Sequence, residues 1–164
     1  MEDGDGPARM NPTSMLDLLD RFALAHTQVT RLTADLKEIV AADQAFRAKV
    51  ELKLTPREMP TDKGVTQFQV TARMLCRGSR ESDDSEKPLF EIELIMQTVY
   101  RQYQGAPVSF EEFSASHGTL TRQLYPLIHH QLQPVFKQFG LDQVKLPYDL
   151  VKSQEPSGEG RQLH

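Results

Sequence analysis

One apolar stripe near the C-terminal end of the chain constrains the fold most. Between Leu120 and Phe139, apolar residues recur at steps of three and four, which is the spacing of one face of an α-helix. The stripe runs for roughly five turns, and Gly140 stands where such a helix would end. Pro126 and Pro134 lie inside it, and each removes an intrahelical hydrogen bond at a cost of about 3 kcal/mol unless packing compensates. We therefore expect this helix to pack on a large surface.

Four segments in which apolar and polar residues alternate with a period of two predict a β-sheet that offers the helix such a surface. They are residues 27–38, 49–54, 65–77 and 89–103. Apolar and polar residues alternate along each of them, as in a strand with one buried face, and their local connections favour antiparallel pairing. Pro56 and Pro60 are expected to close the second strand, because proline cannot donate to a strand ladder. The predicted fold class is α+β, a four-stranded antiparallel sheet with the long main helix packed on it.

The remaining segments complete a single domain over residues 13–151. A short amphipathic helix is predicted at residues 14–25, and residues 104–118 are predicted to form a crossover loop, with room for a helical turn, between the last strand and the main helix. Residues 1–12 are rich in Gly, Pro and Asp, residues 152–164 are rich in Ser, Gly and Glu, and both ends are predicted to be disordered.

Composition excludes several classes of function. The hydrophobic fraction is 38% and Trp is absent, so either the core is lean or association between subunits supplies part of the stability. The net charge of −4 and the lack of a Lys/Arg run argue against nucleic acid as a partner. No apolar run approaches the roughly 18 residues of a membrane span, and the polar N-terminal stretch has no signal-peptide core. We expect a cytoplasmic protein without direct membrane insertion.

The residues that suggest chemistry have simpler explanations. His129 and His130 are adjacent on the predicted helix and would point about 100° apart, which makes them a poor pair of metal ligands. Cys76 falls on the apolar face of a strand, where a thiol is inert. Glu91 and Glu93 share a strand face that is expected to be solvated. We predict no catalytic residue, no metal site and no cofactor.

Aromatic residues also occur in the predicted connections. Phe46 lies in the first connection, and Phe110 and Phe113 lie in the crossover. They either close the core or line an adaptable groove for varied apolar segments.

The order of these elements resembles the SecB family of export chaperones and the SecB-like chaperones linked to toxin–antitoxin systems. The residues that carry the likeness are Phe90-Glu91-Ile92-Glu93-Leu94, Leu124-Tyr125-Pro126, Gly140, and Leu146-Pro147-Tyr148-Asp149-Leu150. The likeness covers roughly residues 27–150. The chain departs from the family pattern at His129-His130, where an Arg-Glu pair is common, and we expect no counterpart in it of the second C-terminal helix and the tail that docks on the SecA motor.

This resemblance implies an ATP-independent holdase for unfolded polypeptides, serving protein export or a dedicated toxin–antitoxin client. It also implies a homotetramer, arranged as a dimer of dimers, with SecA or an antitoxin as further partners. The expected oligomer interface is Leu124, Leu127, Ile128, Leu132 and Phe136. The expected client-binding residues are Phe46, Phe90, Ile92, Leu94, Met96, Phe110 and Phe113.

Two other classes stay open at this point. A small hotdog-like acyl-thioester hydrolase would hold an acyl chain between helix and sheet and would use Glu91 or Glu93 as a base. The third hypothesis is a non-catalytic module that binds a partner.

Overall fold

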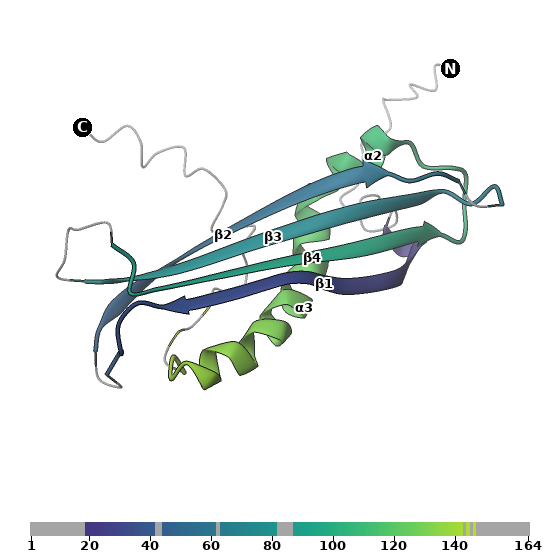
Figure 1. Ribbon diagram of the computed structural model, residues 1–164. Helices are drawn as coiled ribbons and strands as arrows, with labels where there is room; N and C mark the ends of the chain where they lie inside the picture. The colour runs from purple at the N-terminus through teal and green to yellow at the C-terminus, as the bar shows by residue number, and fades with distance from the viewer. Residues whose placement is uncertain are drawn as a thin grey trace, which may run out of the picture.

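A single antiparallel sheet with helices on one face makes up the described part of the molecule (Figure 1). The computed structural model describes residues 19–41, 44–61, 63–81, 87–142, 144 and 146. The strands are β1 (Phe22–Leu36), β2 (Phe46–Glu58), β3 (Gln67–Arg80) and β4 (Phe90–Gln102), and the helices are α2 (Phe110–Ala115) and α3 (His117–Gln138). The strand order is β1-β4-β3-β2, which leaves β1 and β2 at the two edges. The predicted α+β class and the four-stranded antiparallel sheet are confirmed.

The core lies between the sheet and α3. Alternate residues of β3 and β4 point toward the helix, and Val70, Ala72 and Leu94 are completely buried there. From the helix, Leu124 and Ile128 are completely buried as well. The period-two and period-3.6 patterns of the sequence thus meet in one apolar layer.

Helix α3 is unbroken although it contains two prolines. Pro126 and Pro134 both lie on its exposed side, and the helix visibly bends as it crosses the sheet (Figure 1). Gly140 has a positive φ of 68°, and its N–H donates to the carbonyl of Lys137 while the N–H of Leu141 donates to the carbonyl of Phe136. These bonds satisfy carbonyls of the last turn, so Gly140 ends the helix as predicted.

Two local predictions differ from the structure. The predicted helix at 14–25 is wrong at its C-terminal end, because β1 already begins at Phe22 and pairs with β4 from there. Strand β2 continues through Pro56, which an edge strand tolerates because one side of its backbone has no partner. The helical turn expected in the crossover is present as α2, whose N-cap Ser109 accepts a hydrogen bond from the N–H of Glu112.

The predicted disordered ends, residues 1–12 and 152–164, lie outside the described residues, as do residues 14–18 of the predicted N-terminal helix. The boundaries of the single domain over 13–151 therefore stay a prediction.

Candidate functional site

The residues predicted to bind clients on β4 and those predicted to form the oligomer interface lie in one core. Phe90, Ile92, Leu94 and Met96 on β4 are at most 2% exposed. Leu124, Ile128, Leu132 and Phe136 on α3 are at most 6% exposed, and both sets belong to the same apolar cluster. Within one chain these side chains therefore bury one another, and of them Phe136 also lines a cavity.

The predicted aromatic residues divide into buried and accessible ones. Phe113 is completely buried and stacks on Phe68, with ring centroids 4.4 Å apart. Phe110 is only half-buried, and its ring lies 6.2 Å from that of Phe68. Phe46 is half-buried at the opposite end of the sheet, where its ring meets Phe90 edge-on at 5.6 Å. Of the predicted client-binding set, only Phe46 and Phe110 reach the surface.

Leu127 is the one exposed member of the predicted oligomer interface, with 38% of its surface accessible. It lies on the side of α3 that faces away from the sheet, together with Pro126, His130 and Pro134. This exposed face of α3 stays a predicted site of contact between subunits.

Edge strand β1 is the accessible apolar surface that the sequence prediction missed. It pairs with β4 along its whole length, and within the described structure its other edge has no partner strand. Leu24 and Leu32 pair with core residues Tyr100 and Leu94, so their side chains lie on the same face of the sheet as the core. They are nevertheless 41% and 45% exposed. Register shifts between Leu24 and His26 and between Val29 and Arg31 mark two bulges in the strand. The apolar surface continues into the next connection, where Ile39 is 91% exposed.

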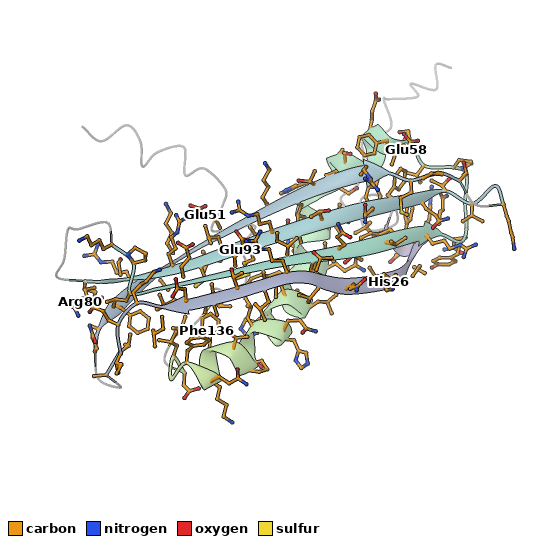
Figure 2. The ribbon with its side chains drawn as sticks, viewed as in Figure 1. His26, Glu51, Glu58, Arg80, Glu93 and Phe136 are labelled. Carbon is orange, nitrogen blue, oxygen red and sulfur yellow. The ribbon has the colours of Figure 1, made fainter. Side chains whose placement is uncertain are left out.

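A cavity of about 270 Å³ lies at the C-terminal end of α3. Its apolar lining is Phe136, Val144 and Leu146, and its polar lining is His129, Gln133, Lys137 and Asp142. Phe136 and Leu146 are buried and Val144 is half-buried, so the floor is apolar while exposed Lys137 and Asp142 form the rim. Figure 2 shows Phe136 on this end of α3. A large apolar side chain is the group that such a cavity suits.

The two histidines diverge, as adjacent helical residues must. His129 lies at the cavity, with its ring 6.2 Å from that of Tyr125 and its Nδ1 3.4 Å from Nε2 of Gln133. His130 is exposed on the far side of the helix. In the part of the chain that the structure describes, no three His, Cys, Asp or Glu side chains gather in a metal-binding group.

Burial controls the titration of the groups beneath α3. Burial raises the pKa of the Cys76 thiol to about 12, which keeps it protonated at neutral pH. Burial, together with a smaller effect of the neighbouring Cys76, raises the pKa of Tyr125 to about 12. The pKa of Tyr100 is likewise raised by burial, and its hydroxyl donates to Oε1 of Gln123 at 2.9 Å. These groups belong to the core, and a protonated thiol is a poor nucleophile.

The carboxylates considered for a hydrolase lie on the wrong face of the sheet. Glu91 accepts from Arg77 at 2.8 Å, and Glu93 accepts from Arg73 at 2.6 Å. Both point away from α3, so neither reaches the space between helix and sheet where an acyl chain would lie. The base proposed for a thioester hydrolase is therefore absent from the described inner face.

Comparison with known proteins rests on structure alone. No family model matches the sequence, and no curated protein sequence matches it significantly. Among solved structures, a SecB-like chaperone of Mycobacterium tuberculosis, Rv1957, in complex with a ChAD peptide from the Rv1956 HigA1 antitoxin, superimposes with a TM-score of 0.63 at 15% identity. The match covers 82% of this chain and 96% of that chain. The chain has the SecB-like fold.

The SecB-like fold confirms the architecture that the resemblance implied. None of the helices in the described ranges is long and apolar enough to cross a membrane.

Proposed function

We propose that this chain is an ATP-independent chaperone that holds non-native polypeptide segments. The observation that carries the proposal is the surplus of accessible apolar surface on a SecB-like fold, at β1 and at the cavity beside α3. No catalytic role is proposed for any residue. The solved neighbour is a chaperone bound to an antitoxin peptide, which supports the choice of a polypeptide as the ligand.

Assembly of the chaperone is proposed to begin at β1. Its free edge offers backbone donors and acceptors to a second strand, and Leu24 and Leu32 would lose their exposure if a second copy paired there. The exposed face of α3, which carries Leu127, would then join two such dimers. This arrangement gives the homotetramer, a dimer of dimers, that the family resemblance implies.

The client is proposed to place an apolar side chain in the cavity at the end of α3. Phe136, Val144 and Leu146 supply the apolar contact, and Lys137 and Asp142 at the rim leave the client backbone in a polar environment. Phe46 and Phe110 would extend the apolar contact at the two ends of the sheet. Affinity is expected to follow client hydrophobicity and to survive added salt.

The cellular role follows from the client. A cytoplasmic chaperone of this kind would keep secreted proteins unfolded for export through SecA, or would protect one antitoxin. The antitoxin role is favoured, because the structural neighbour is bound to an antitoxin peptide.

The decisive experiment measures suppression of aggregation of a denatured client without ATP, together with calorimetry against a permanently unfolded client. Val144→Asp should weaken client binding about tenfold, because it places a carboxylate on the cavity floor and removes an apolar contact worth about 1.5 kcal/mol. If the wild-type protein neither suppresses aggregation nor binds any unfolded client, the chaperone proposal fails.

The matched control is Val65→Asp. Val65 is also half-buried, but it lines a smaller cavity of about 170 Å³ between the β2–β3 turn and residues 102–107. This variant should bind the client as the wild type does. Equal losses in both variants would mean that the cavity beside α3 is not the client site.

A further inference from the structure

The face of the sheet that points away from α3 has two electrostatically different halves. In the first half, nearest to the end of β1, the strand register sets Asp35, Glu91, Arg77 and Lys49 in one row across the sheet. The next row contains Glu93 and Glu51. Carboxylates and cations occur together here, and Arg77–Glu91 and Lys49–Glu51 form ion pairs.

The second half has cations but no carboxylates. Its first row runs from Arg31 on β1 through Arg73 to Lys53 on β2, and further rows add Arg57 on β2 and Arg101 on β4. We call these five residues, with the Gln and Thr side chains between them, the cationic half. Glu58, at the end of β2, pairs with buried Phe68 and therefore lies on the face of the sheet that carries α3. Figure 2 shows Glu51 and Glu93 toward one end of the sheet and His26 in the other part.

Three of these cations are unused by the fold. Lys53, Arg57 and Arg101 are exposed, and none of them forms an ion pair with any carboxylate of the described residues. Arg31 and Arg73 share a single carboxylate, Glu93, at 3.6 Å and 2.6 Å. The cationic half therefore carries a local positive charge on a chain whose net charge is −4.

The surroundings of these cations indicate the kind of anion. Between them lie half-buried Ile95 and Val99 and polar side chains such as Gln69, Gln97 and Thr71. The polar side chains can donate to and accept from a peptide backbone. No Phe, Tyr or Trp occupies this face in the described strands and His26 is its one imidazole, so it offers little of the stacking platform that single-stranded nucleic acids use. Arginines bind separate carboxylates well, in bidentate pairs.

We propose that the cationic half of the open sheet face binds an acidic segment of a partner polypeptide. This surface lies on the side of the sheet opposite α3, so it is separate from the cavity proposed for clients. A chain bound there would leave the client cavity free, and the protein could hold a client and an acidic partner together. The inference does not depend on the chaperone proposal, because it rests on the charges of the sheet alone.

The test uses the full chain and a labelled 20-residue peptide of alternating Glu and Ser, with the Gln-Ser peptide as its uncharged counterpart. Fluorescence anisotropy should show binding of the Glu-Ser peptide that weakens as salt rises, and much weaker binding of the Gln-Ser peptide. Lys53→Glu/Arg57→Glu should weaken binding by about tenfold or more, since two surface ion pairs with the peptide are lost and each new carboxylate repels it.

The matched control is Lys87→Glu, compared with the single variant Arg57→Glu. Both change the net charge equally, but Lys87 precedes β4 at the far end of the sheet. Arg57→Glu should reduce affinity and Lys87→Glu should not. Equal effects of the two would overturn the site, because only net charge would then matter. Equal or tighter binding of a single-stranded oligonucleotide, with the same sensitivity to Arg57→Glu, would overturn the choice of a polypeptide.

Discussion

The two edge strands of the sheet carry very different amounts of charge. Strand β1 has Arg31 and Asp35 as its only Asp, Glu, Lys or Arg residues, and it contains no proline. Strand β2 is shorter and contains Pro56 together with the charged residues Arg47, Lys49, Glu51, Lys53, Arg57 and Glu58. Charges, lysines above all, and proline are the usual means by which an edge strand avoids pairing with another chain. Only β2 is protected in this way.

The leucines on the core face of the same two strands also differ in exposure, and those of β1 are the more exposed. Leu52 and Leu54 on β2 are 8% and 7% exposed, whereas Leu24 and Leu32 on β1 are 41% and 45% exposed. The leucines on the inner side of β2 are therefore covered and those of β1 are not, although α3 crosses behind the sheet toward β1 (Figure 1). The comparison teaches that one chain completes its core at one edge only. We expect a second copy of the chain to pair with the other edge.

The largest expected effect comes from protecting β1 as β2 is protected. Leu24→Lys/Leu32→Lys should shift the protein to monomers and weaken self-association about 100-fold or more, because a charge buried at a strand pair costs several kcal/mol. Light scattering at several protein concentrations measures this shift. A wild-type protein that is already monomeric at tens of micromolar would contradict the role of β1.

A control for this variant exists on β2. Ala48 is exposed on β2 and lies on the same face of the sheet as Leu24 and Leu32. Ala48→Lys therefore adds a charge at the protected edge. Its self-association should match that of the wild type. If Ala48→Lys dissociates the protein and the β1 variant does not, the two edges have been assigned the wrong way round.

A second, intermediate effect tests how well the β2 side is sealed. Cys76 pairs with Val50 of β2, and burial raises its pKa from 9.0 to about 12. The folded state thus retains a proton that the unfolded state loses, so stability is fully present below pH 9.0 and falls as pH rises toward 12. The free energy of unfolding should fall by up to about 1.4 kcal/mol per pH unit for each such group, and Tyr125 adds to the slope above its ordinary pKa.

Denaturant titrations of the wild type and of Cys76→Ala between pH 8 and 11 measure this slope. The variant should be less stable at pH 8 but should lose stability less steeply at higher pH, since only the tyrosine terms remain. Identical slopes, or rapid alkylation of Cys76 in the folded protein at pH 8, would show that the β2 side is not sealed.

Much of the fold could be predicted because its patterns are local. The inner residues of β4 and the stripe of α3 follow strict periods, and Gly140 ends the helix for a reason that is visible in the sequence. The start of β1 was harder, because Leu18, Leu19 and Phe22 also fit a helical period, and pairing with β4 decides the outcome. Tertiary pairing overrode local preference there.

The candidate site was less predictable, because exposure depends on how far the helix reaches across the sheet. Apolar residues of β4 and α3 were expected to contact clients or other subunits, but they bury one another. Leu24 and Leu32 look no different from core leucines in the sequence. The contrast in charge between residues 22–36 and 46–58 was the available signal, because a strand poor in charge at an edge requires an explanation.

The smallest expected effect concerns the charges of β2 themselves. If they serve to prevent pairing, they need not stabilise the fold. Lys49 lies 3.4 Å from Glu51, and the two side chains are 79% and 56% exposed, so solvent screens most of their attraction. Lys49→Thr should change the free energy of unfolding by less than about 0.5 kcal/mol, as measured by urea titration, while a strand-favouring residue takes the place of a charge at the edge.

Self-association at high protein concentration is the more sensitive measurement, and Lys49→Thr combined with Lys53→Thr should increase it slightly. A marked loss of stability without any change in association would mean that these charges hold the strand in place, and the contrast between the two edges would then rest on the exposure of Leu24 and Leu32 alone.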